Sequence, residues 1–192
     1  MSVTPTTPVK LGYTAPEFQL RDVVSNSHVS FSDVSKENGI VVMFICNHCP
    51  FVVHVLDELI RIGNHYQDQG IGFVAISSND VSNYPQDSPE KMKELALKTI
   101  FPFPYLYDET QEVAKAYFAA CTPDFSVFDK EAICVYRGQL DDSSPGNSEH
   151  VHGEDLRKIL DQLINETPVS INQKPSIGCN IKWKTGNQPD YV

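Results

Sequence analysis

Two cysteines three positions apart, Cys46 and Cys49, are the residues of this 192-residue sequence whose type and spacing most directly indicate chemistry. A spacing of three places the two sulfurs about one helical turn apart, so that they can join in a small ring. The thiolate form of cysteine attacks disulfides and also leaves easily. The pattern therefore predicts a dithiol that cycles between reduced and disulfide states, with Cys46 as the nucleophile and Cys49 as the resolving thiol.

The elements on either side of the pair determine how reactive it can be. Residues 40–45 form an unbroken apolar run rich in β-branched residues, which predicts a strand buried on both faces of a sheet. A helical stripe follows at Val52, Val55, Leu56, Leu59 and Ile60. Asn47 is the predicted N-cap, with Pro50 in the first turn. Because a helix N-terminus favours negative charge, we expect an exposed Cys46 with a lowered pKa, lowered further by a protonated His48.

The rest of the sequence predicts a single α/β domain. Residues 71–77 predict a second strand, which completes a parallel strand–helix–strand unit. The other predicted elements are a hairpin of 17–20 and 29–31, a helix from Ser88, a strand at 105–107, a helix at about 110–120, an antiparallel hairpin of 125–128 and 132–136, and a helix at 156–164. We expect residues 1–167 to form a mixed sheet covered by helices, and residues 168–192 a tail packed on it.

Composition narrows the range of partners. The chain has 15 Lys+Arg against 25 Asp+Glu, a net charge of -10, which argues against nucleic acid as a partner. No apolar run approaches the ~20 residues needed to span a membrane, and the polar N-terminus has no secretory h-region. We therefore expect a cytoplasmic protein. Five cysteines is an odd number, so at least one thiol has no partner within the chain.

Several motifs together resemble a known family. The sequence is similar to thioredoxin-fold, peroxiredoxin-like proteins of the thiol-specific antioxidant and alkyl hydroperoxide reductase-like group, in particular to a subgroup that carries CxxC. The likeness runs from about residue 12 to residue 165. It rests on Ala15-Pro16-Glu17-Phe18-Gln19-Leu20, Cys46-Asn47-His48-Cys49, Cys121-Thr122-Pro123-Asp124 and the late segment from Pro175 to Trp183.

The resemblance implies a three-layer thioredoxin-like fold with an N-terminal hairpin and a C-terminal tail extension. It also implies a cis-proline at Pro123, facing the cysteine pair, and a Thr122 backbone that pairs with the chain of a bound substrate. We expect no cofactor, a disulfide-containing protein or small thiol as substrate, and an external reductant such as a thioredoxin or glutathione system.

Two other functions stay open beside thiol–disulfide exchange. One is a thiol peroxidase with antioxidant activity, although Met43 stands where the resemblance expects a threonine three residues before the reactive cysteine. The other is a non-enzymatic carrier of copper or another metal. Cys46, His48, Cys49 and His54 could ligate zinc, but structural zinc sites draw on two separated ligand pairs and no second pair is present, so we predict no metal.

The remaining cysteines divide into two groups. Cys121, two residues before Pro123, and Cys179, in the tail beside Trp183, are candidates for additional redox thiols that exchange with the pair. Either could equally be a buried thiol without a redox role. Cys134 alternates within an apolar strand and is predicted to be a core residue.

Overall fold

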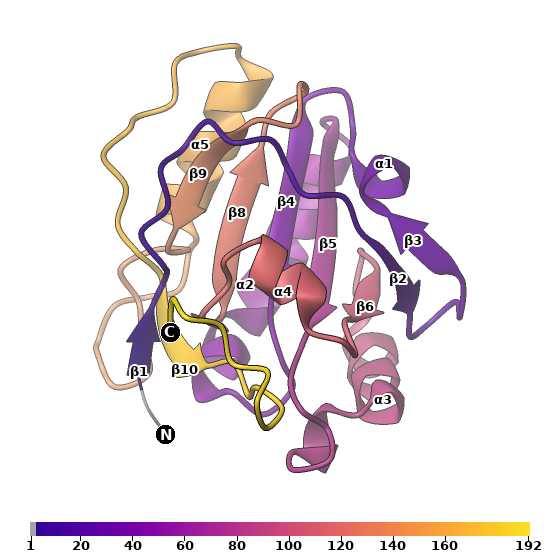
Figure 1. Cartoon of the computed structure of the whole chain (residues 1–192). Coiled ribbons are helices and arrows are strands. Elements are labelled where there is room, and N and C mark those ends of the chain that lie inside the picture. The colour runs from indigo at the N-terminus through magenta and orange to yellow at the C-terminus, as the bar shows by residue number, and fades with distance from the viewer. Residues whose placement is uncertain (1–2) are drawn as a thin grey trace.

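A mixed sheet forms the centre of the computed structural model, which describes residues 3–192 (Figure 1). Its strand order is β3-β2-β6-β5-β4-β8-β9. The parallel strands β4, β5 and β6 lie in the middle, and the antiparallel pairs β2–β3 and β8–β9 lie at the two sides. The strand bounds are β2 Gln19–Asp22, β3 His28–Ser30, β4 Gly39–Phe44, β5 Ile71–Ser77, β6 Tyr105–Tyr107, β8 Asp124–Phe128 and β9 Cys134–Gly138.

Helices cover both faces of this sheet, which gives three layers. On one face lie α2 (Pro50–Gln67), α3 (Pro89–Thr99) and α5 (Glu154–Ile164), and on the other lie α1 (Phe31–Val34) and α4 (Glu112–Ala116). Side chains of β4 alternate between the two cores: Val41 and Met43 face α2, whereas Val42 and Phe44 face α1 and α4. The predicted thioredoxin-like layer structure is confirmed.

A second, three-stranded sheet was not predicted from the sequence. It consists of β1 (Val3–Pro5), β10 (Ile177–Asn180) and β7 (Cys121–Thr122), in the antiparallel order β1-β10-β7. Figure 1 shows β1, from the N-terminal part of the chain, beside β10, from the C-terminal part, below the main sheet. The C-terminal tail thereby contributes a strand beside the segment that contains Thr122.

Two helix predictions need correction. The helix predicted at 110–120 is only Glu112–Ala116, because Gln111 and Phe118 have left-handed backbone angles that end it on both sides. The helix predicted to start after Asn47 starts at Pro50, with Cys49 as its N-cap. Pro50 still occupies the first turn. Within residues 3–192, none of the helices combines the length and apolarity needed to cross a membrane.

Candidate active site

Cys46 and Cys49 lie where β4 ends and α2 begins. Cys46 follows the strand by two residues, and Cys49 is the residue before the helix. The two sulfurs interact directly. The sequence predicted an exposed Cys46, but its exposed fraction is 1% and that of Cys49 is 0%. The small sheet and the loop before α3 pack against this end of the strand, and the His48 side chain between the two cysteines is partly exposed.

The turn between the two cysteines is held by a buried carboxylate from another part of the chain. Asp87 ends the short 3₁₀ helix η1 (Pro85–Asp87), and its Oδ1 accepts the backbone N–H groups of Asn47 at 2.9 Å and His48 at 3.3 Å. The Asn47 side chain bonds outward, to the Gln86 carbonyl and the Tyr105 hydroxyl. Asn47 is therefore engaged elsewhere and leaves the N-cap position to Cys49.

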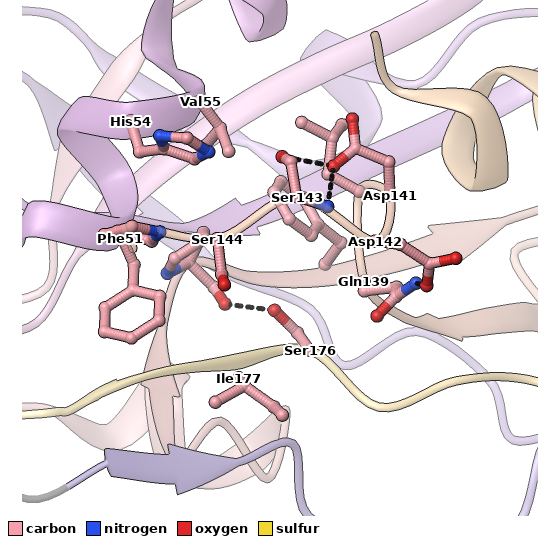
Figure 2. Close-up of a pocket in the computed structure, with 14 residues that line it drawn as sticks. Phe51, His54, Val55, Gln139, Asp141, Asp142, Ser143, Ser144, Ser176 and Ile177 are labelled. Atoms are coloured by element: carbon pink, nitrogen blue, oxygen red, sulfur yellow. Dashed lines mark hydrogen bonds between the residues drawn. The ribbon is translucent and has the colours of Figure 1, made fainter. Parts of the chain in front are cut away.

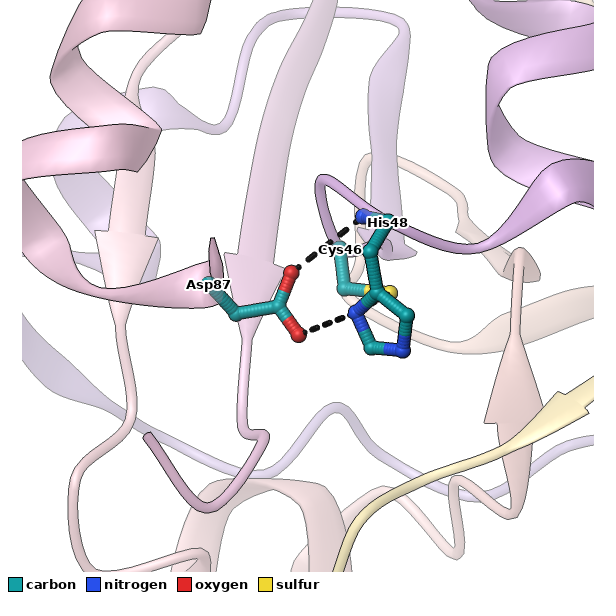
Figure 3. A group of neighbouring side chains, drawn as sticks. All are labelled: Cys46, His48 and Asp87. Atoms are coloured by element: carbon teal, nitrogen blue, oxygen red, sulfur yellow. Dashed lines mark hydrogen bonds and ion pairs between the residues drawn. The ribbon is translucent and has the colours of Figure 1, made fainter. Parts of the chain in front are cut away.

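His48 connects Cys46 to Asp87 (Figure 3). Its Nδ1 lies 2.6 Å from Asp87 Oδ2 and 3.9 Å from Cys46 Sγ. Asp87 Oδ2 also accepts a hydrogen bond from Asn79 at 2.8 Å, and the ring of Tyr84 stacks on His48 at 5.5 Å. The carboxylate is 0% exposed, so its charge is held by these donors alone within the described chain.

The pKa values of the two thiols shift in opposite directions, and the lowered one belongs to Cys49, whereas the sequence predicted a lowered pKa for Cys46. The hydrogen bond from the Cys46 thiol lowers the pKa of Cys49 to about 4, with smaller contributions from Thr122, Cys179 and the Val52 amide. The same hydrogen bond, with burial and the nearby Asp87 carboxylate, raises the pKa of Cys46. The helix begins two residues later than predicted, so its N-terminal amides serve Cys49 rather than Cys46.

Thr122 and Pro123 face the cysteine pair, and the peptide bond between them is cis, as the resemblance implied. The Thr122 hydroxyl lies 3.5 Å from Cys46 Sγ. Cys49 Sγ lies 3.1 Å from the Thr122 carbonyl oxygen, to which its thiol donates when protonated. The backbone of Thr122 pairs with Cys179 of the chain's own β10. That Thr122 pairs with a substrate stays a prediction.

All five cysteines are buried thiols. Cys179 interacts with the Cys49 sulfur, and burial raises its pKa to about 12. Cys121 lies on the neighbouring strand, where burial raises its pKa and its sulfur contacts the Pro123 carbonyl at 3.7 Å. Cys134 is 1% exposed and packs in the core, as predicted. Of the two candidates for an additional redox thiol, the structure brings Cys179 into contact with the pair.

A cleft of about 140 Å³ lies between the start of α2 and the loop that follows β9 (Figure 2). Phe51 and His54 of α2 line one part of it, and Ser144 and Ile177 line other parts. Pro123 also lines this cleft, and Phe51 follows Cys49 by two residues, so the cleft begins close to the cysteine motif in the chain. Within residues 3–192, His54 Nε2 is buried and has no hydrogen-bond partner, which leaves a polar atom at the cleft for a ligand.

One group of side chains could hold a metal ion. Cys46, His48 and Asp87 offer a sulfur, a nitrogen and an oxygen within 4.8 Å of one another. This group differs from the zinc set considered from the sequence, since Asp87 joins Cys46 and His48 while His54 lies at the cleft. The Asp87 oxygens already accept hydrogen bonds, so a metal ion would have to replace the hydrogen bond between His48 and Asp87.

Asp87, Asn79 and Tyr84 are the site residues that sequence reasoning missed. Asp87 is 39 positions from His48 and directly precedes the N-cap of α3, where an acidic residue is unremarkable. No spacing pattern links it to the cysteines, and only the folded chain brings it under the turn.

Comparison with known structures supports the fold and extends it to the whole chain. A crystal structure of an uncharacterized conserved protein from Geobacillus kaustophilus is 56% identical, with a TM-score of 0.94, and the alignment covers 96% of this chain and 97% of that one. A crystal structure of a hypothetical protein from Sinorhizobium meliloti 1021 is 41% identical, with a TM-score of 0.93, covering 95% and 100%. Among curated protein sequences, none matches significantly.

A more distant structure shares the fold. The thioredoxin domain of a thiol-disulfide oxidoreductase from Bacteroides vulgatus is 16% identical, with a TM-score of 0.61, covering 80% of this chain and 99% of that one. The model of the AhpC/TSA family matches residues 11–137, which include the CxxC motif, the cis-proline and the whole central sheet except its last residue. The chain therefore belongs to the AhpC/TSA family and has a thioredoxin-like fold.

Proposed function

We propose that the protein is a thiol–disulfide oxidoreductase in which Cys46 and Cys49 exchange with the disulfide of a protein or a small molecule. The observation that carries this proposal is the approach of both sulfurs to Thr122, whose hydroxyl lies 3.5 Å from Cys46 Sγ and whose carbonyl oxygen lies 3.1 Å from Cys49 Sγ. The lowered pKa of Cys49 supports it. Such a pair has a nucleophile available at neutral pH and a second thiol in place to complete the exchange. The membership of a thiol-based redox family agrees with this chemistry.

The reaction would proceed in two steps. Cys46 attacks one sulfur of the substrate disulfide, and its proton passes along the existing hydrogen bond to the Cys49 thiolate. The Cys46–substrate mixed disulfide forms, and the other half of the substrate leaves as a thiolate. The Cys49 thiol then attacks Cys46, so that the Cys46–Cys49 disulfide forms and the remaining half of the substrate leaves as a thiol. An external dithiol then returns two electrons and one proton, which restores the Cys46 thiol and the Cys49 thiolate and completes the cycle.

His48 and Asp87 are positioning residues in this scheme. His48 lies between the Cys46 sulfur and the partly exposed edge of the site, where a protonated ring would stabilise negative charge on Cys46 during attack. Asp87 holds both the ring and the backbone of the turn. The cleft between Phe51 and Ile177 offers a place for a side chain of the substrate.

An assay of protein disulfide reduction tests the proposal. Wild-type protein, Cys46→Ser, Cys49→Ser and the control Cys134→Ser are compared on a model protein disulfide, with a small dithiol as recycling reductant. We expect each of the first two variants to lose about 100-fold or more in rate, and the core control to stay within about twofold. A Cys46→Ser variant with full activity would overturn the proposal.

Peroxide reduction is a second candidate because of one contact. Position 43 holds Met and so provides no hydroxyl near Cys46, but another residue does. Thr122 Oγ1 lies 3.5 Å from Cys46 Sγ. Cys46 would take one oxygen from a hydroperoxide, releasing the alcohol, and its sulfenic acid would condense with Cys49 to give the disulfide and water. Peroxide consumption that falls in Thr122→Val but not in Thr110→Val would support this candidate, and equal rates in all three proteins would exclude a role for this contact.

A further inference from the structure

The C-terminal strand β10 places a third thiol against the reactive pair. In the small sheet, Cys179 is the direct partner of Thr122, and Cys49 Sγ lies 3.1 Å from the carbonyl oxygen of that same Thr122. The Cys179 and Cys49 side chains interact, and Cys179 is 3% exposed. The interactions thus run from His48 through three sulfurs in turn, in the order Cys46, Cys49 and Cys179.

The close approach of β10 depends on a glycine. A Cβ atom on Gly178 would lie 2.0 Å from the Thr122 carbonyl oxygen, which is closer than two such atoms can come. Only glycine therefore allows β10 to lie this near to Thr122. On its other edge the strand is held by β1, where Val3 pairs with Cys179. The position of Cys179 is fixed from both sides by strand pairing.

We propose that Cys179 is a third redox thiol, which exchanges with the oxidised pair and forms a Cys49–Cys179 disulfide inside the protein. This inference rests on the proposed exchange activity of Cys46 and Cys49. The Cys179 sulfur attacks Cys49, the Cys46–Cys49 bond breaks, and Cys46 leaves as a thiolate that takes up the proton released by Cys179. One disulfide replaces another, so no oxidant is needed beyond the one that oxidised the pair.

The geometry favours Cys179 in this role over the other thiol nearby. Cys121 is adjacent to Thr122 in β7, and neighbouring residues of a strand point to opposite faces. Its thiol donates to the Pro123 carbonyl, and the described effect of Cys49 on it is electrostatic, whereas Cys179 shares a hydrogen bond with Cys49. Internal exchange would free the Cys46 thiol while the disulfide stays in the interior. The protein would then have a second oxidised form in which Cys46 is reduced.

Disulfide mapping of the oxidised protein tests this inference. Reduced wild type, Cys46→Ser, Cys179→Ser and the control Cys121→Ser are oxidised with diamide, quenched in acid with a maleimide, digested without reductant and analysed by mass spectrometry. We expect Cys46→Ser to form the Cys49–Cys179 link, because these sulfurs are already in contact. In wild type and in Cys121→Ser we expect this link in at least about one-tenth of the oxidised chains, beside Cys46–Cys49.

The outcomes separate this inference from the proposed function. If wild type forms Cys46–Cys49 alone and Cys46→Ser keeps Cys49 and Cys179 as thiols, the third thiol has no redox role while the proposed function stands. If wild type forms neither link, both are wrong. If Cys46→Ser does not fold, the mapping of the wild-type protein decides. Cys179→Ser is then its control, because this variant cannot form the Cys49–Cys179 link and should show Cys46–Cys49.

Discussion

The buried carboxylate of Asp87 should be essential to the turn that carries the cysteines. One of its oxygens accepts hydrogen bonds from the backbone N–H groups of Asn47 and His48. The other accepts a hydrogen bond from the Asn79 side chain and lies 2.6 Å from His48 Nδ1. Asp87→Asn keeps the shape of the side chain but replaces one oxygen with an NH₂ group. Two of the four groups around the side chain then face the new NH₂ group, which cannot accept a hydrogen bond from them. The negative charge beside Cys46 is also lost.

The size of the effect follows from these contacts. A buried donor left without an acceptor costs about 1–3 kcal/mol, so two of them cost about 2–6 kcal/mol of unfolding free energy. The His48 side chain is 18% exposed and can turn toward water, which places the expected loss at the lower end, about 2–4 kcal/mol. Since the carboxylate raises the pKa of Cys46, the variant should also show a lower pKa for this thiol.

Urea unfolding and a thiolate absorbance titration measure the two effects. The matched control is Asp108→Asn, because Asp108 is also 0% exposed and accepts from the Ser78 hydroxyl at 2.8 Å and the Ala114 N–H at 2.9 Å. We expect the control to lose stability without a change in the cysteine titration. A loss below about 0.5 kcal/mol in Asp87→Asn, in the range of surface substitutions, together with an unchanged titration, would refute the reasoning.

Four more predictions concern the cysteines and the small sheet. The reduced protein should show the absorbance of one thiolate at neutral pH, and this absorbance should fall as the pH passes through about 4; a midpoint near 8.5, as in ordinary cysteine, would contradict the assignment to Cys49. Because the pKa of Cys49 is lower in the folded protein than in the unfolded one, its ionisation stabilises the fold fully above the unfolded pKa. This contribution should be lost as the pH falls toward about 4. Acid unfolding curves of wild type and Cys49→Ser measure it. Gly178→Ala should displace β10, lower the unfolding free energy by about 1–3 kcal/mol and speed the alkylation of Cys179; unchanged alkylation would show that the strand does not depend on the close approach to Thr122. Cys134→Ala should cost about 1 kcal/mol of stability and leave the exchange rate unchanged, measured by urea unfolding and the disulfide assay.

The main sheet and its helices could be predicted because their signals are local. The apolar run at β4 and the helical stripe of α2 each specify an element within a few turns of chain, and both are buried as expected. The small sheet could not be found this way. Its strands contain two to four residues, and β1 pairs with β10 across almost the whole chain, so that the pairing leaves no periodic pattern.

The candidate site was predictable only where a motif marks it. Cys46, Cys49 and the cis-proline at Pro123 stand in recognisable segments, and the structure brings all three together. The pKa of Cys46 was predicted to be lowered, but its hydrogen bond with Cys49, burial and the Asp87 carboxylate raise it. The helix also starts at Pro50, after Cys49. Asp87 is 39 positions from His48, and no local pattern encodes such a long-range contact.

The most direct test of the central claim is to trap the first covalent intermediate. Reduced Cys49→Ser protein is mixed with a model protein disulfide, quenched with a maleimide and digested for mass spectrometry, with Cys46→Ser as its matched counterpart. The account predicts a stable mixed disulfide between Cys46 and the substrate in the first protein and none at Cys49 in the second, because Cys46 attacks and Cys49 resolves. A substrate linked to Cys49 in Cys46→Ser, with none on Cys46 in Cys49→Ser, would contradict it.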